Sequence, residues 1–266
     1  QDAEIANYHV GREIVSIQAP LEQIAKETSH FGFFNARPDP DGPLRQAPLF
    51  FRHKDRLYPS LSLKSVAMYF DYDIHPLAGQ LFANTIGGVE FGGDSPVPTD
   101  EQGVQLINYY KDPANYFPTF SIADIIDGTV DPSAYEGKII MVGATALGLF
   151  DLRPNPFSPS TPGVYIHAMS AQNMIDGLFL QRFQGIGLWE SLGYLFLGLL
   201  FGLVLPRLPP WAGLLATFAA IMGLFAFDTM LVFPSGYWML LVFPTIQMIT
   251  QFLGITVYGY LTEGRE

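Results

Sequence analysis

The sequence predicts an α/β, mixed-sheet domain over residues 1–183, followed by a three-helix transmembrane region over residues 184–262. Two observations predict this fold class. In the first part, short apolar runs alternate with turn signals, as in domains that alternate strands with helices. The second part is almost uncharged, because only six of the 39 charged residues in this 266-residue chain follow residue 183.

Turn signals and helix caps place the elements of the first domain. Strands are expected at 13–17 and 104–110, a hairpin at 49–59 around Lys54 and Asp55, and helices at 20–28, 60–70 and 122–127. Ser60 and Ser121 precede two of these helices and are expected to cap them. The run at 138–144, "KIIMVGA", is almost continuously apolar, which predicts a central strand buried on both faces.

A glycine-containing turn follows that run and raises the question of nucleotide binding. Gly143 and Gly148 have the spacing of a phosphate-binding loop, but Leu149 and Phe150 stand where that loop needs lysine and then serine or threonine. Without the cation the turn cannot offset phosphate charge, and the dinucleotide pattern G-x-G-x-x-G is also absent. The sequence therefore argues against a nucleotide site.

The tail contains three stretches long enough to cross a bilayer, which takes roughly 20 apolar residues. They lie at about 186–205, 211–233 and 237–261. The alternative, three buried helices of a large soluble domain, fits poorly because these stretches are apolar on all sides. Trp189, Trp211 and Trp238 each stand near the end of a stretch, as residues at membrane interfaces do.

Small residues mark where the three helices are expected to touch, since close backbone approach drives helix packing in lipid. The candidates for helix packing are Gly198 and Gly202, which form a GxxxG pair, and Ala212, Ala216 and Gly223 in the second stretch. Asp228 has two interpretations: it pairs across helices as a functional carboxylate, or it reaches the outer interface from near a span end.

Two basic residues suggest the orientation. Arg207 is the only basic residue between the first two stretches, and Arg265 follows the third. If both are cytoplasmic, the first domain lies outside the membrane, and residues 263–266 begin a cytoplasmic linker.

Composition excludes several functions. The net charge of −11, most of it in the first domain, argues against nucleic acid as a partner, because phosphate binding needs a basic surface. The absence of cysteine removes disulfides, zinc–thiolate sites and thiol nucleophiles. The five histidines are scattered without ligand spacing, and no G-x-S-x-G elbow is present. No metal site and no catalytic residue is therefore assigned.

Several stretches resemble the CHASE2 domain, the extracytoplasmic sensor module of bacterial signalling receptors. They are "GFFNARPDPDGPLRQAPL" (32–49), "LYPSLSL" (57–63), "INYY" (107–110), "FPTFSIADIIDG" (117–128), "EGKIIMVGATALGLFDLRPNPFS" (136–158) and "PGVYIHAMSAQNMIDG" (162–177). The resemblance spans about residues 30–183. Receptors of this family normally open with a membrane helix and further strands, and this chain begins with Gln1 rather than Met. We therefore expect a fragment or a processed product.

The resemblance implies the input unit of a receptor in the bacterial inner membrane, with residues 1–183 periplasmic and three helices leading to a cytoplasmic output. That output is expected to be a class III adenylate cyclase making cAMP from ATP, working as a homodimer. Mg²⁺ and ATP would be cofactors of the cyclase domain alone, and no cofactor is expected in this chain. The alternative outputs are a histidine kinase, a serine/threonine kinase or a diguanylate cyclase.

Two further classes of function compete with signalling. A membrane-anchored assembly protein would use the first domain only as an interaction surface. A transporter fits poorly, because three stretches with so few carboxylates are a small basis for that task. Membrane lipid and an unidentified extracytoplasmic signal are the expected partners in the receptor hypothesis.

Five residues are candidates for binding that signal. Asn108 and Tyr109 end an expected strand, where open α/β sheets place ligands, although such aromatics are more often core. Asp151 and Arg153 could contact a ligand or form an ion pair that fixes their loop. His167, expected at the end of a strand, could titrate as a switch or serve as a hydrogen-bonded structural residue.

Overall fold

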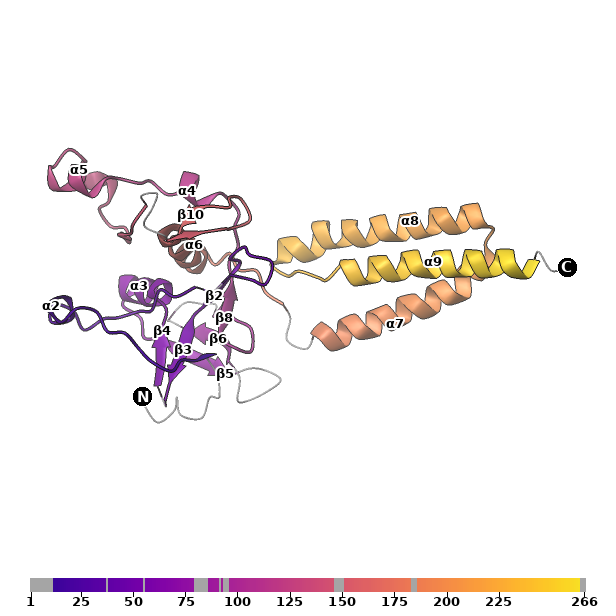
Figure 1. The fold of residues 1–266 in the computed structure, drawn as a ribbon, viewed down its shortest axis with the longest axis horizontal. Coiled ribbons are helices and arrows are strands. Elements are labelled where there is room, and N and C mark those ends of the chain that lie inside the picture. The colour runs from indigo at the N-terminus through magenta and orange to yellow at the C-terminus, as the bar shows by residue number, and fades with distance from the viewer. Residues whose placement is uncertain are drawn as a thin grey trace. The chain divides into compact units, whose positions relative to one another are not determined.

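The computed structural model describes residues 12–36, 38–54, 56–78, 86–90, 92, 96–145, 151–182 and 186–263. The chain divides into two compact units, Gln1–Gln181 and Arg182–Glu266 (Figure 1). Unit 1 combines short strands with helices, and unit 2 is helical. Gly148, Leu149 and Phe150 of the glycine-containing turn lie outside the described residues.

Small sheets build unit 1. One joins β1 (Arg12–Glu13), β3 (Phe50–His53) and β4 (Arg56–Pro59), and a second joins β5 (His75–Ala78), β6 (Ile86–Glu90) and β7 (Val97–Pro98). Two-stranded ladders pair β2 (Gln46–Pro48) with β8 (Val104–Leu106), and β9 (Leu152–Arg153) with β10 (Thr161–Pro162). The β1–β3 pair is parallel and the other ladders are antiparallel, so the α/β class with a mixed sheet is confirmed.

The helices of unit 1 differ greatly in length. They are α2 (Glu22–Ala25), α3 (Leu61–Phe70), α4 (Pro113–Tyr116), α5 (Ile122–Ile126), the 3₁₀ turn η1 (Pro132–Ala134) and α6 (Gly163–Asp176). Helices α3 and α6 pack against each other (Figure 1). The two longest helices therefore provide the framework on which the small sheets lie.

The expected hairpin and helix caps are confirmed. Strands β3 and β4 pair in register around Lys54, whose φ of 54° gives the left-handed conformation of the turn. The Ser60 hydroxyl accepts a hydrogen bond from the Leu63 amide and begins α3, and Ser121 begins α5 by accepting from the Ala123 amide. These caps satisfy amide groups that have no partner inside their helices.

Helix α6 contributes to both hydrophobic clusters of unit 1. In the larger cluster, Ala171 and Met174 pack with residues of the sheets and of α3, among them Leu49, Leu63, Val66, Ile86, Val89 and Val97. In the smaller cluster, Ile166 and Met169 pack with Leu44 and Ile107. The core of unit 1 is thus organised around a single helix.

The expected central strand at 138–144 is wrong. Among the described residues no strand pairs with this segment, and exposure alternates along it: Ile139 and Met141 pack on the larger cluster, whereas Ile140 is 56% and Val142 is 77% exposed. A Cβ at Gly143 would lie 2.5 Å from the Val164 side chain, so the segment passes close to α6. The run therefore has one half-buried face and forms no strand, and its continuous apolar pattern gave no sign of this alternation.

Three other expected elements are shorter in the structure. The strand at 13–17 ends at Glu13, and the helix at 20–28 is reduced to Glu22–Ala25, which carries no buried residue. The strand at 104–110 ends at Leu106. The Ile107 amide still donates to the Arg45 carbonyl in the same register, and the next amide, that of Asn108, leaves the ladder and donates to the Asn173 side chain.

Unit 2 is a bundle of three helices, α7 (Ile186–Val204), α8 (Pro210–Phe227) and α9 (Val242–Glu263). The 3₁₀ turn η2 (Leu205–Arg207) ends α7, whereas α8 continues through a π-helical turn, η3 (Asp228–Val232), into η4 (Phe233–Ser235). Helix α9 packs against both α7 and α8 (Figure 1). Phe201, Leu205 and Met248 form the buried centre of the bundle.

Two of the three expected spans remain as candidates. Gly187–Arg207 and Pro210–Ser235 are long and apolar enough to cross a membrane, and together they support membrane association. The third stretch, expected at 237–261, does not reach the same hydropathy, and its helix begins only at Val242. The physical reason is that α9 carries glutamine and threonine side chains, whose polar groups lower its mean hydropathy.

Candidate functional site

A buried amide on α6 holds the end of β8. The Asn173 side chain is fully buried; its Oδ1 accepts from the Asn108 amide at 2.8 Å and its Nδ2 donates to the Asn108 carbonyl at 3.1 Å. This pair replaces the ladder bonds that Asn108 would make in a longer strand. Asn173 thus uses its side-chain amide to bond the backbone of a distant segment.

Two more polar contacts join α6 to the same region. The Ser170 hydroxyl donates to Gln105 Oε1 at 2.7 Å, and both side chains are buried. The Tyr110 hydroxyl donates to Asp176 at 3.0 Å, and burial raises the pKa of Tyr110, which stays a neutral donor. Side chains of α6 therefore form hydrogen bonds with the backbone and side chains of residues 105–110.

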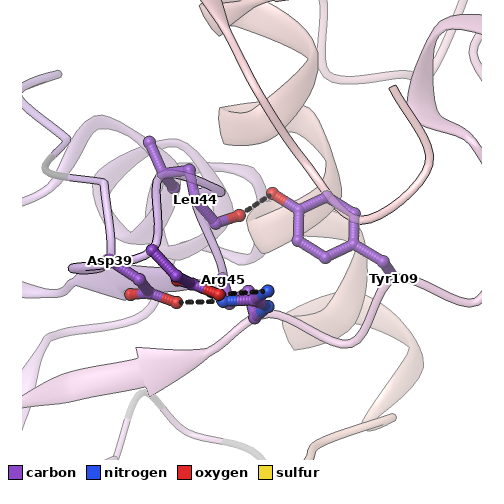
Figure 2. A network of polar contacts seen from close by, with 5 residues as sticks. Asp39, Leu44, Arg45 and Tyr109 are labelled. Atoms are coloured by element: carbon purple, nitrogen blue, oxygen red, sulfur yellow. Dashed lines mark hydrogen bonds and ion pairs between the residues drawn. The ribbon is translucent and has the colours of Figure 1, made fainter. Parts of the chain in front are cut away.

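An ion-pair clamp, formed by Arg45 with Asp39 and Asp41, holds the loop that precedes β2 (Figure 2). Arg45 donates to Asp41 through two bonds of 2.9 Å and to Asp39 at 3.1 Å. The hydrogen bond from Arg45 lowers the pKa of the exposed Asp41 carboxyl, and the bond to Asp41 raises the pKa of Arg45. A planar guanidinium is suited to such bidentate contacts.

Tyr109 contacts the residue next to Arg45 and so joins the loop of the ion-pair clamp to the rest of unit 1. Its hydroxyl donates to the Leu44 carbonyl at 2.9 Å (Figure 2), and its ring packs on the smaller hydrophobic cluster. Burial raises the pKa of Tyr109, with a smaller contribution from the negative charge of Asp39. The Leu44 amide in turn donates to the Pro154 carbonyl. Tyr109 thus joins two loops.

His167 lies inside helix α6 rather than at the end of a strand, which corrects its expected setting. Its Nε2 lies 2.9 Å from the Phe34 carbonyl, and its Nδ1 lies 3.3 Å from the Ser62 hydroxyl. Because a carbonyl only accepts, Nε2 carries the proton and Nδ1 accepts from Ser62. Burial lowers the pKa of His167, opposed by the Phe34 carbonyl and by the charge of Asp151.

Asp151 and Arg153 form an ion pair beside the start of α6. Their charged groups lie 3.7 Å apart, and both side chains are partly exposed. The Asp151 carbonyl accepts from the Gly163 amide, and a Cβ at Gly163 would lie 2.8 Å from the Asp151 carboxylate. A carboxylate at the first turn of a helix is favoured by the helix dipole. This geometry fits the second of the two interpretations, in which Asp151 and Arg153 form an ion pair that fixes their loop.

Of the five candidate ligand-binding residues, His167 lies on α6 and the other four lie in other segments of unit 1. Asn108, Tyr109 and His167 form hydrogen bonds with other groups of unit 1. None of the five candidates lines a cavity of about 70 Å³ in unit 1. That cavity lies between the β1–β3–β4 sheet and residues 31–33. Ligand binding by these five residues stays a prediction.

The sequence analysis did not identify a cluster of polar side chains at the end of unit 2 where α7 begins. Glu190, in the first turns of α7, has a side chain only 6% exposed and pairs with Arg182 at 2.7 Å. The other carboxylate oxygen accepts from the Leu240 amide at 3.3 Å. The Arg182 guanidinium lies over the Trp238 ring, 4.7 Å from its centre. A glutamate inside an apolar stretch is the signal that could have identified this cluster.

A ladder of hydrogen bonds continues from Glu190 along the α7–α9 interface. The Tyr194 hydroxyl donates to the Leu240 carbonyl at 3.2 Å, and Gln247 donates to the Tyr194 carbonyl at 2.8 Å. One turn further, Gln251 donates to the Gly198 carbonyl at 3.1 Å. The glutamines that lower the hydropathy of α9 thus face α7.

The expected helix-packing residues take different positions. A Cβ at Gly198 would lie 2.6 Å from Gln247 Nε2, so the glycine makes room for the ladder. Gly202 and Gly223 have open space at the same place, whereas Ala212 and Ala216 are half-buried on α8. Their role in packing stays a prediction. The most buried positions of α8 are Gly213 and Thr217, which the pattern did not single out.

Asp228 opens the π-helical turn of α8. Its Oδ1 is buried, and it has no hydrogen-bond partner in the part of the chain that the structure describes. Within those described residues, neither the cross-helix pair nor any other partner satisfies this oxygen. A π-turn frequently marks a functional position in a helix.

These observations support membrane association of a chain in which a mixed α/β module precedes apolar helices. The family model of the CHASE2 domain matches residues 3–205, and the chain belongs to the CHASE2 family. CHASE2 domains are extracytoplasmic sensors of membrane signalling proteins. No curated protein and no solved structure matches the chain.

Replacing Asn173 with leucine should destabilise unit 1. The change leaves the half-buried amide and carbonyl of Asn108 without their Asn173 partners, which costs about 1–3 kcal/mol. We expect a lower thermal midpoint for the detergent-solubilised chain, followed by near-ultraviolet circular dichroism. The neighbouring Gln172→Leu, which removes only an exposed contact to Asp176, should move it far less. Equal shifts for the two variants would contradict the role given to Asn173.

Acidification should weaken unit 1 through His167. Its pKa in the fold lies below the ordinary 6.5, so the unfolded chain binds the proton more readily. The stabilisation is complete above about pH 6.5 and is lost as the pH falls through the lowered pKa of the folded state. His167→Gln, which can still donate to Phe34, should flatten this part of the stability–pH curve. Parallel curves for the two proteins between about pH 7 and 5 would refute the assignment.

Proposed function

We propose that the chain is the extracytoplasmic sensing and transmembrane signalling region of a receptor whose cytoplasmic output is a class III adenylate cyclase. One observation carries the proposal: the CHASE2 match extends from residue 3 to residue 205, through the whole of α7. The sensor domain and the first candidate span therefore form one continuous family unit. Residues 1–183 are periplasmic in this proposal, and the membrane is the bacterial inner membrane.

Helix α9 is the third span in this proposal. Its 22 residues measure about 33 Å at a rise of about 1.5 Å per residue, enough to cross the hydrocarbon core. Its lower hydropathy is compatible with a membrane because Gln247 and Gln251 donate to backbone carbonyls of α7. Polar side chains that bond across helices are a recognised means of packing in lipid.

A signal at unit 1 would act by shifting the helices between two arrangements. The α7–α9 ladder bonds specific carbonyls, those of Tyr194 and Gly198, and so defines a discrete register between the two helices. A ligand that favours one arrangement shifts the population by its difference in affinity. Two cytoplasmic catalytic domains of a homodimer would then convert ATP into cAMP at different rates, with Mg²⁺ bound there and not in this chain.

A non-signalling assembly protein is the second candidate, and α5 is the observation that favours it. The helix carries no buried residue, and Ile122 and Ile126 are 60% and 77% exposed. Exposed apolar side chains of this kind suit contact with another protein. Histidine kinase, serine/threonine kinase and diguanylate cyclase outputs share the sensing mechanism and differ only in the cytoplasmic domain.

Single cysteines should report the topology without background, since the chain has none of its own. In intact cells we expect Ser133→Cys, on the surface of unit 1, to react with a membrane-impermeant maleimide. Leu208→Cys, between α7 and α8, and Thr262→Cys, near the end of α9, should react only after the membrane is opened. Labelling of Thr262→Cys in intact cells would place the C-terminal end of α9 outside the cytoplasm and would contradict a third span.

The signalling proposal predicts that the ladder controls output. With the chain fused at its C-terminus to a class III cyclase catalytic domain, Gln247→Leu should change cellular cAMP by about fivefold or more, the usual range of coupling between sites. The matched control is Thr250→Leu on the same helix, whose hydroxyl bonds only carbonyls of its own helix. Equal cAMP in the wild type and both variants would favour the assembly protein.

A further inference from the structure

A cavity of about 720 Å³ lies within unit 2, at the end of the bundle where α7 and α9 begin. Irregular backbone creates it. Helix α8 passes into the π-turn at Asp228–Val232, α9 starts only at Val242, and residues of the π-turn and of the segment before α9 line the cavity. Gly193 lines the cavity from α7, and a Cβ there would have open space around it.

The lining of this cavity offers hydrocarbon contacts. Trp189, Leu197, Phe227, Leu231 and Met239 are among the side chains that form it. Three polar side chains of the lining are already engaged: both oxygens of Glu190 accept hydrogen bonds, Tyr194 donates to Leu240, and Ser235 donates to Leu231. A polar ligand would therefore find few free partners inside the cavity.

The surroundings identify the occupant. An apolar cavity does not hold water, and two of its walls are α7 and α8, the helices apolar enough to lie in a bilayer. The medium that reaches the cavity is then lipid hydrocarbon. Its volume lies within the range of about 300–1,000 Å³ that is usual for ligand sites.

A cation lies next to the polar end of the cavity. Arg182 pairs with Glu190, which lines the cavity, and one third of the Arg182 side chain is exposed. Arginine binds phosphate through several donors at once. Trp238, over which Arg182 lies, is the kind of residue found at the level of lipid headgroups.

We propose that this cavity binds a membrane phospholipid, with one acyl chain among the helices and the phosphate beside Arg182. The proposal rests on the proposed function only in requiring that unit 2 lie in a membrane. The acyl chain fills the space between α7, the π-turn of α8 and the segment before α9, and so holds these three elements at a fixed separation.

Filling the cavity with a side chain tests the proposal. Gly193→Leu places four carbons where the acyl chain would lie, and Gly193→Met gives a second filling variant with an unbranched side chain. The matched control is Gly202→Leu on the same helix, where the added side chain also meets open space but outside the cavity. The full chain is purified from membranes into detergent, reconstituted in nanodiscs of phosphatidylglycerol and phosphatidylethanolamine, and the phospholipid that it retains is counted by native mass spectrometry.

We expect one retained phospholipid for the wild type and for Gly202→Leu, and about tenfold less retention for both Gly193 variants, as for a site whose volume is taken. Equal retention in all four proteins overturns the site, and so does retention of detergent or free fatty acid in place of phospholipid. Extraction of membranes with alkaline carbonate separates this failure from failure of the proposed function. A chain released by carbonate is not membrane-spanning, whereas a chain that stays and shows equal retention lacks only the lipid site.

Discussion

The structure of the sensor unit depends on the contact between helix α6 and the chain that leaves strand β8. Asn173 makes this contact with both the oxygen and the nitrogen of its side-chain amide. Met174 and Met169, close to it on the same helix, belong to the two hydrophobic clusters of unit 1. A buried amide with two backbone partners specifies one position of a helix along a strand, because any shift leaves polar groups unpaired. The segment of Asp151 is bonded to the start of that helix, and the segment of Phe34 is bonded to His167 on it.

Local chemistry made some elements predictable. The caps Ser60 and Ser121 and the β3–β4 hairpin follow from residues within a few positions of each other, and the structure contains them. The segment 138–144 was misjudged because its apolar run does not reveal which neighbours are present. Only the packing of Ile139 against distant residues, with Ile140 left exposed, shows that one face of this chain is buried.

The hydrogen-bond partners of the candidate residues could not be predicted from the sequence, and ligand binding by these residues stays a prediction. Tyr109 and His167 were selected for position and chemistry, yet their hydrogen bonds reach Leu44 and Phe34, which are far away in sequence. In the helical unit, hydropathy averages over all faces of a helix and so counts Gln247 and Gln251 against α9. The structure shows that both glutamines serve the interface with α7, which a one-dimensional average cannot represent.

The carboxylate of Glu190 is shared between two elements: one oxygen holds Arg182, and the other holds the Leu240 amide just before α9 begins. Arg182 is also the first residue of the helical unit, directly after the end of the sensor unit. A pull on the chain at this point is therefore delivered to the beginnings of α7 and α9 together. Glu190 therefore ties the first turns of α7 to the segment that leads into α9.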